Sequence, residues 1–156
     1  MTEPVNVFDV ETRYREDRPE QFRRGGLPLA PLIGGKLLGA SVYELPPAQS
    51  ICPYHYEYGN EEWLIVLAGR PTLRTPEGER ELVPGEITCF PEGPAGAHKV
   101  TNRGQEAVRV LMVSTKDAPA VWVYPDSDKI ALWTGNAADG LMARRSSHVD
   151  YWDGEV

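Results

Sequence analysis

The chain has 156 residues, enough for one domain that buries roughly 70% of the surface of its unfolded form. Its formal net charge of −7, with no basic cluster beyond two arginine pairs, argues against nucleic acid and anionic membranes as partners. The longest apolar run, Trp63 to Ala68, is far shorter than the ~20 residues of a membrane-spanning helix, and no secretory signal precedes it. We therefore expect a cytoplasmic protein.

The order of polar, apolar and turn-forming residues predicts an all-β fold. Residues 11–26 are highly charged without a regular apolar period, which predicts a surface loop or arm with room for one short helical turn. From Lys36 onward, short β-like stretches alternate with turn signals at the spacing of a sandwich or barrel. The expected strands cover residues 36–45, 51–56, 62–68, 72–74, 80–82, 86–90, 96–102, 108–114, 121–124 and 129–133.

Within this pattern, the stretches 62–68 and 108–113 are apolar on both faces, so we expect them to be central strands. The chain then divides into an N-terminal arm or loop that packs on a barrel (1–35), the barrel itself (36–134) and a C-terminal tail (135–156).

The segment from Pro53 to Glu62 carries the strongest chemical signal. In an extended chain His55 and Glu57 point to one side, and the tyrosines that alternate with them point to the other. A tight Gly59-Asn60 turn would form a hairpin and return Glu61 or Glu62 to the same side. Imidazole nitrogen and carboxylate oxygen suit Fe, Mn, Zn or Ni, and such a cluster rarely faces a core without a cation. The segment therefore predicts half of a metal site.

A second half requires another nitrogen ligand, and two further histidines are present. His98 follows a Gly/Pro-rich loop and opens a short β-like stretch beyond the expected hairpin. His148 lies in a polar tail after Arg144-Arg145, where Asp150 is the nearest carboxylate. We therefore assign the second half of the site to His98.

Both segments resemble the two sequence motifs of the cupin superfamily. The first motif reads G-x5-H-x-H-x(3,4)-E-x6-G. Its two His positions correspond here to His55 and Glu57, and its Glu and final Gly correspond to Glu62 and Gly69. The second reads G-x5-P-x-G-x2-H-x3-N, and the matching residues are Gly85, Pro91, Gly93, His98 and Asn102.

Three departures from these motifs are visible. Glu57 replaces the second His of the first motif, Gln49 stands in place of its first Gly, and the loop from Gly93 to His98 is longer by two residues. The chain otherwise is similar to small single-domain bacterial cupins. That resemblance implies a double-stranded β-helix, or jelly-roll barrel, with little helix, and a homodimer.

The resemblance also implies one divalent metal ion per chain, with His55, Glu57, Glu62 and His98 as its ligands. Fe, Mn and Zn are the expected ions, with Ni as a further candidate. In one alternative, Glu57 is instead a general base or an orienting group beside a site made by the other three. In another, both carboxylates are hydrogen-bonded and the cavity holds a metal-free ligand. Glu61 is expected to be a solvated turn carboxylate.

Three functions follow from these alternatives. The first is a metal-dependent enzyme that acts on a small polar, carbohydrate-derived metabolite as an isomerase, epimerase, lyase or dioxygenase. The second is a non-catalytic domain that binds or senses a small ligand, and the third is a structural barrel stabilised by metal. The pattern identifies no substrate-binding residue, although a flap at 124–129 could offer Lys129 to an anionic substrate. Cys52 and Cys89 are expected to be reduced and buried; in the alternative, Cys52 lines the mouth of the pocket or is a redox-sensitive thiol.

Overall fold

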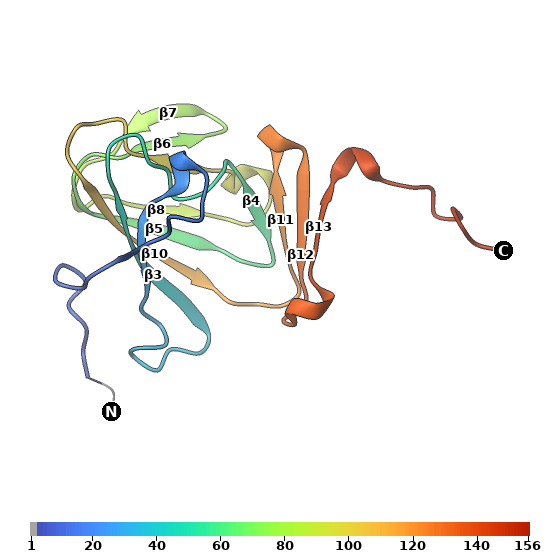
Figure 1. Cartoon of the computed structure of the whole chain (residues 1–156), viewed down its shortest axis with the longest axis horizontal. Coiled ribbons are helices and arrows are strands. Elements are labelled where there is room, and N and C mark those ends of the chain that lie inside the picture. The colour runs from blue at the N-terminus through green and yellow to red at the C-terminus, as the bar shows by residue number, and fades with distance from the viewer. Residues whose placement is uncertain (1–2) are drawn as a thin grey trace.

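The computed structural model describes residues 3–156 and consists of antiparallel strands joined by loops and short turns (Figure 1). The strands are β1 (Arg13–Tyr14), β2 (Gly25–Pro28), β3 (Leu38–Leu45), β4 (Tyr56–Tyr58), β5 (Glu62–Ala68), β6 (Thr72–Thr75), β7 (Gly78–Glu81), β8 (Ile87–Phe90), β9 (Lys99–Thr101), β10 (Val108–Thr115), β11 (Ala120–Tyr124), β12 (Lys129–Trp133) and β13 (Leu141–Arg144). The helical elements are single 3-10 turns: η1 (Glu20–Phe22), η2 (Pro94–Gly96), η3 (Pro125–Ser127), η4 (Ala137–Asp139) and η5 (Arg145–Ser147). The prediction of an all-β fold with little helix is confirmed.

The strands form two layers around one core. The larger sheet has the order β1-β2-β3-β10-β5-β8, and the opposite layer consists of β7-β6-β9 and β13-β12-β11-β4. Isolated bridges at Ser50–Thr101 and His55–His98 connect the segment before β4 to the chain around β9. Side chains from β5 and β10 pack against those from β6 and β9 in the core between the layers. Within residues 3–156 there is no helix that is both long and apolar enough to cross a membrane.

Strand β5 shows how the sequence positions the site. Leu64 and Val66 are fully buried in the core, whereas Trp63, which precedes Leu64, is 44% exposed on the outer face. Because side chains alternate along a strand, Glu62 lies on the same inner face as Leu64. The strand pairs on both sides, with β10 and β8, so the predicted central position is confirmed. The start of β5 therefore directs a carboxylate into the barrel.

The expected hairpin between residues 51–56 and 62–68 is wrong. Strand β4 pairs with β11, whereas β5 pairs with β10 and β8, so the two segments belong to different sheets. Asn60 explains why the chain passes from one sheet to the other between β4 and β5. Its side-chain oxygen accepts hydrogen bonds from the Thr115 hydroxyl (3.0 Å) and the Asp117 amide (2.9 Å). These bonds fix the turn to the end of β10, and Gly59 supplies the positive φ of 84° that the reversal requires.

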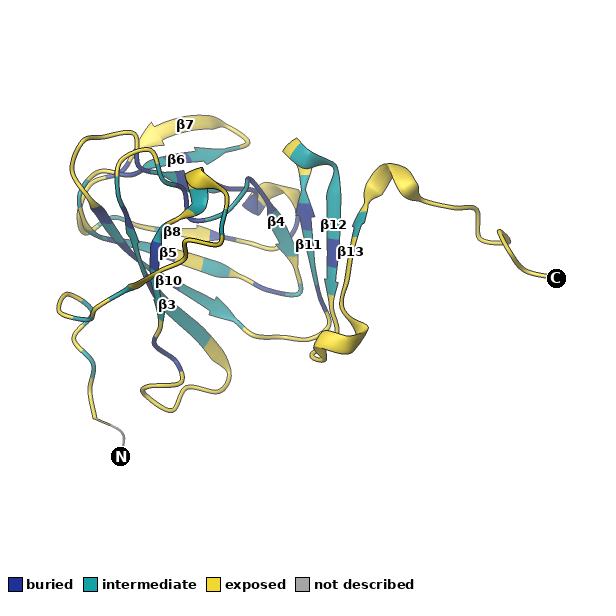
Figure 2. Cartoon of the chain, in the orientation of Figure 1, coloured by how far each residue is buried: buried dark blue, intermediate teal, exposed yellow. Residues whose placement is uncertain are grey.

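The charged N-terminal segment contains more structure than its sequence indicates. Strands β1 and β2 extend the larger sheet beyond β3, so residues 11–26 are not only a surface loop. The segment is also hydrogen-bonded to the other layer, where the Ser50 amide donates to Gln21 O (2.8 Å) and Arg24 Nε to Ile51 O (2.8 Å). At the other end, β13 adds a strand beside β12, and the segment after it extends away from the barrel and is exposed (Figures 1 and 2).

Asn102 is a fully buried polar residue that joins three segments. Its Nδ2 group donates to the carbonyl oxygens of Leu45 and Glu106, both at 2.8 Å, and its Oδ1 accepts from the Gly104 amide at 2.9 Å. These bonds connect the ends of β3 and β9 with the loop that leads into β10. Without them, buried carbonyl groups would lose their donors.

We expect Asn102→Ala to lower the free energy of unfolding by about 2–4 kcal/mol, because the substitution removes these bonds and leaves buried acceptors unpaired. Asn136→Ala is the matched control. The exposed Asn136 side chain accepts from the Ala138 amide and donates to the exposed Asp139 carboxylate, both at 3.1 Å, so its loss should cost about 1 kcal/mol or less. Urea unfolding in the presence of a chelator measures both. Equal losses in the two variants would contradict this role of Asn102.

Candidate metal centre

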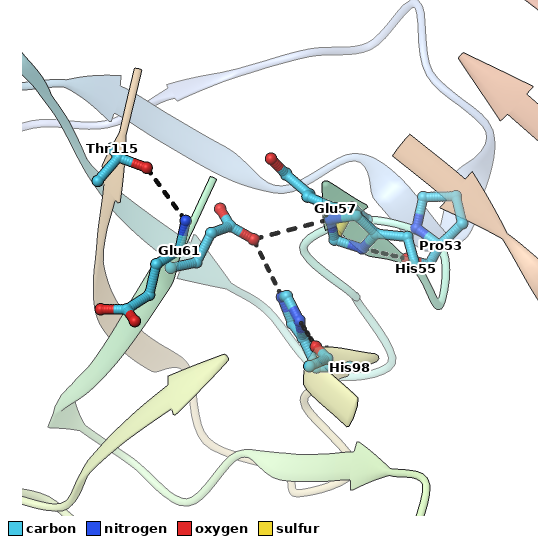
Figure 3. Close-up of polar contacts among 9 residues, drawn as sticks. Pro53, His55, Glu57, Glu61, His98 and Thr115 are labelled. Carbon is cyan, nitrogen blue, oxygen red and sulfur yellow. Dashed lines mark hydrogen bonds and ion pairs between the residues drawn. The ribbon is translucent and has the colours of Figure 1, made fainter. Parts of the chain in front are cut away.

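His55 and His98 face each other across an isolated antiparallel bridge. The amide of His55 donates to His98 O (3.1 Å), and the amide of His98 donates to His55 O (2.8 Å). Because directly opposed residues of such a pair project to the same side, the two rings lie close together, with centroids 4.7 Å apart (Figure 3). The backbone therefore brings together two imidazoles that are 43 positions apart in the printed sequence.

The loop before His98 explains why its ring is held in place. The residues that make this loop longer than the cupin motif include the single turn η2, which ends at Gly96. A Cβ atom on Gly96 would lie 1.8 Å from Pro91 O, so no other residue fits there. The Gly96 carbonyl accepts from His98 Nδ1 at 2.9 Å, and the Phe90 ring stacks on His98 with a centroid distance of 3.7 Å. The ring is fixed by one hydrogen bond and one aromatic face.

The hydrogen bonds of the two rings determine which nitrogen faces the barrel interior. His98 Nδ1 contacts a carbonyl, and so does His55 Nδ1, which lies 3.1 Å from Pro53 O. A carbonyl oxygen can only accept, so Nδ1 carries the hydrogen in both rings and a neutral ring has its lone pair on Nε2. These Nε2 atoms lie 3.8 Å (His55) and 3.4 Å (His98) from Oε2 of Glu62. Figure 3 shows the two rings converging on this point.

The Glu62 oxygen at this point has no hydrogen-bond partner. Oε2 is a buried atom without a hydrogen-bond partner in the described part of the chain, and burial of such an atom is costly. Ligand atoms of Glu62, His55 and His98 all lie within 4.8 Å of one another. Metal bonds to nitrogen and oxygen are about 2.0–2.2 Å long, so a cation between these atoms would satisfy all three. The donor set therefore fits a divalent metal ion.

The charges inside the barrel shift the pKa values of these groups strongly. Burial, together with repulsion from Glu57, raises the pKa of Glu62 to about 7. Burial and the neighbouring His55 lower the pKa of His98 to about 3. Burial also lowers the pKa of His55, but the adjacent Cys52 thiol and the Glu57 and Glu62 carboxylates outweigh it and raise this pKa to about 11. The three groups are thus arranged to stabilise positive charge between them, where a bound cation would replace the proton of His55.

The remaining carboxylates of the motif occupy two different environments. Glu57 Oε1 lies 3.6 Å from His55 Nε2, with 11% of the side chain exposed, but Glu57 is not part of the group whose atoms all lie within 4.8 Å. Glu61 turns away from the histidines, accepts a hydrogen bond from Trp63 Nε1 (2.7 Å), and is exposed (Figure 3). His148 is exposed in the tail after η5.

Two further residues lie beside the centre, and both belong to the segment 124–129 for which the sequence suggested a flap. The Tyr124 ring stacks on His55 at a centroid distance of 5.8 Å, and Lys129 Nζ lies 5.1 Å from the centroid of the Tyr124 ring. Burial raises the pKa of Tyr124 to about 12, with the nearby Cys52, Glu57 and Glu62 adding to it, so the phenol keeps its proton. Tyr124 ends β11 and precedes a Pro-Asp turn, and the sequence suggested a role for Lys129 of this segment but none for Tyr124.

The cysteines differ from the sequence-based expectation. Cys52 is half-buried, and its Sγ lies 3.5 Å from Nδ1 of His55. Cys89 is exposed, so the expectation that it is buried is wrong. The reason is the register of β8, because Cys89 pairs with Trp63 and shares its outward-facing side of the sheet.

The comparisons with known proteins agree with the fold. The profile of the cupin domain family matches residues 41–114, which include every residue of the candidate centre. The chain is therefore a small protein built on a cupin domain. No curated protein matches the chain.

Three solved structures show how far this similarity extends. A sugar phosphate isomerase of the cupin superfamily from Silicibacter pomeroyi superposes with a TM-score of 0.80 at 23% identity, covering 97% of this chain and 98% of its own. A protein proposed to be a sugar phosphate isomerase, from Acidithiobacillus ferrooxidans, gives 0.81 at 20% identity, with coverage of 92% and 91%. The polyketide cyclase RemF from Streptomyces resistomycificus gives 0.61 at 24% identity, with coverage of 77% and 84%. The predicted jelly-roll barrel is thereby confirmed.

We expect His98→Ala to weaken metal binding by more than about 100-fold, because removal of a ligand costs at least as much as removal of a group that only supports one. His148→Ala should leave the affinity unchanged, since His148 is exposed in the tail. Competition with a chromogenic chelator, followed by elemental analysis, measures both variants. Equal loss in the two variants, or no loss in either, would refute the assignment of His98.

Proposed function

We propose that this chain is a metal-dependent enzyme that moves a proton on a small polyhydroxylated carbonyl compound, in the manner of an isomerase or epimerase. The observation that carries the proposal is the convergence of His55 Nε2, His98 Nε2 and Glu62 Oε2, which has no hydrogen-bond partner, beside a fourth group, the half-buried Glu57. A purely structural site would have no need of the additional carboxylate.

The residues that would hold the ion are His55, Glu62 and His98, with one ion per chain. Two imidazoles and one carboxylate suit Fe(II), Mn or Zn and do not fill the coordination shell of such an ion. When bound, the ion would supply Lewis-acid polarisation of a carbonyl or hydroxyl oxygen. Glu62 would offset one of its two positive charges.

Glu57 is the residue to which we assign the proton transfer. It lies beside the centre without belonging to the compact ligand group, and only a small part of its side chain is exposed. Its carboxylate would accept a proton from a carbon next to the polarised carbonyl and return it to the neighbouring carbon. Tyr124 keeps its phenol proton and can donate a hydrogen bond to a substrate oxygen, while Phe90 keeps water away from one face of His98. In the alternative role, Glu57 is a fourth ligand.

The names of the similar structures support the choice of substrate class. Two of them are described as sugar phosphate isomerases or proposed to be such, and the chain covers more than nine-tenths of each. At 20–23% identity this likeness concerns the fold, so the substrate class rests on the proposal. Proton transfer next to a carbonyl is the chemistry that the centre and Glu57 together can perform.

The test is deuterium exchange into a panel of aldose and ketose phosphates, followed by proton NMR of metal-loaded protein in D₂O. We expect loss of the signal from the hydrogen next to the carbonyl for at least one compound, and we expect a chelator to abolish it. If compounds bind but none exchanges in any metal form, the chain is a ligand-binding domain and the enzyme proposal fails.

We expect Glu57→Gln to slow this exchange by about 100-fold or more while the metal content stays the same, because the amide keeps the shape but cannot accept the proton. Glu61→Gln is the matched control, since the Glu61 carboxylate points away from the centre. A large loss of metal in Glu57→Gln would instead assign Glu57 to the ligand shell.

A further inference from the structure

A cavity lined by arginines lies against the N-terminal strands, outside the metal centre. It has a volume of about 280 Å³ between β2, β3 and the chain before them, and its principal lining residues are Arg13, Arg15, Arg18, Arg24, Ser41 and Tyr43. Four guanidinium groups around one cavity are unexpected in a chain with a net charge of −7. The charge distribution therefore marks this place as a site for an anion.

Most of this positive charge is not neutralised by the protein. Arg15 forms a bidentate ion pair with Asp17, in which Nε and Nη2 donate to the two carboxylate oxygens at 2.9 and 2.7 Å. Among residues 3–156, the guanidinium groups of Arg13 and Arg18 form no ion pair, although Arg18 is attracted to Asp17 at longer range. Arg24 contacts the Ile51 backbone oxygen and the Tyr43 side chain, neither of which carries a charge. Like charges held together without a counter-ion repel each other, and a bound anion would relieve this repulsion.

Arg24 is held in a defined position rather than extended into solvent. Its guanidinium lies over the Tyr43 ring, 3.8 Å from the centroid, and its Nε donates to Ile51 O. Gly26 makes this possible, because a Cβ atom there would lie 2.8 Å from Arg24 Nη1 and 3.2 Å from Tyr43 Cδ1. Burial is the main cause that lowers the pKa of Arg24, and repulsion from Arg18 adds to it. A fixed, half-buried guanidinium is suited to a phosphate or carboxylate, which it can bind through two hydrogen bonds.

The cavity and the metal centre share the inner face of the larger sheet. Ser41 of β3 pairs with Met112 of β10, which pairs with Leu64 of β5. Glu62 lies two residues before Leu64 and on the same face. Two strand spacings and two residues along a strand separate Ser41 from Glu62, which corresponds to about 12 Å.

A second connection runs through the opposite layer. Arg24 is hydrogen-bonded to Ile51, and the next residue, Cys52, lies 3.5 Å from the His55 ring. The cavity is thus linked to the metal centre from both layers, at a distance that one small extended molecule can span.

We propose that the cavity of Arg13, Arg15, Arg18 and Arg24 binds a doubly charged anionic group, a phosphate ester in particular, of the molecule whose carbonyl end lies at the metal centre. In this form the inference rests on the proposed function, whereas anion binding by the arginines does not. The carboxylates of Glu57 and Glu62 repel an anion and the arginines attract it, so the ligand has one favourable orientation. A phosphorylated sugar meets these requirements, and an uncharged sugar does not.

The first experiment measures binding of inorganic phosphate to metal-depleted protein by calorimetry at low ionic strength. We expect a Kd of about 1 mM or lower for the unmodified chain and weakening of at least about tenfold in Arg13→Gln/Arg18→Gln, whose removed groups have no structural partner. The control, Arg80→Gln/Arg103→Gln, changes the net charge equally at arginines paired with Glu86 and Glu79, and should bind as the unmodified chain does. No saturable binding, or equal weakening in both variants, would overturn the anion site.

The second experiment uses the same phosphate with Mn(II)-loaded protein and measures the relaxation of its ³¹P signal. Phosphate in the cavity should relax faster with the manganese-loaded protein than with the same protein loaded with Zn(II), and His98→Ala should abolish the difference. Phosphate binding without this relaxation in protein that contains manganese would overturn the link to the metal centre. A chain that takes up no manganese would contradict the proposed function but leave the result in metal-depleted protein intact.

Discussion

The arrangement of the barrel interior depends on the orientation of two imidazole rings. Each ring uses Nδ1 to contact a backbone carbonyl, of Pro53 or Gly96, so that Nε2 faces the buried oxygen of Glu62. The surrounding backbone holds the two rings in this orientation. The antiparallel bridge brings the two residues together, and the glycine turn before His98 supplies a carbonyl at the required place. A buried oxygen without a donor is costly, and a cation is the simplest group that removes this cost.

Negatively and positively charged side chains lie at opposite ends of the inner face of the larger sheet. Carboxylates gather at the metal centre, where burial raises the pKa of Glu62 and the acids beside His55 favour positive charge. At the other end of the same inner face, four arginines surround a cavity, and of these only Arg15 forms an ion pair, with Asp17. In our account, a cation neutralises the carboxylates at one end and an anion neutralises the arginines at the other. A single substrate provides both the anionic group for the arginines and the carbonyl that contacts the cation.

The sequence predicted features that depend on local patterns and missed those that depend on packing between distant segments. The run from 62 to 68 was assigned with its correct limits because an apolar stretch bounded by turns has few alternatives. The Gly59-Asn60 pair was interpreted as a hairpin turn, but the Asn60 side chain is hydrogen-bonded to the end of β10, which local sequence cannot show. Of the expected metal ligands, three lie close together in the structure, and the role of Glu57 stays a prediction. Strand β1 was not expected because its segment is highly charged, and its pairing with β2 explains why Arg13 lines the cavity beside Gly26.

Anomalous X-ray diffraction at the absorption edge of the metal, on crystals of protein purified without added metal, tests the central claim most directly. The account predicts one strong peak per chain within bonding distance, about 2.0–2.2 Å, of His55 Nε2, His98 Nε2 and Glu62 Oε2. Two outcomes would contradict the account. One is a peak at other residues, and the other is the absence of any peak at this centre after crystals are soaked in Mn(II), Fe(II) or Zn(II).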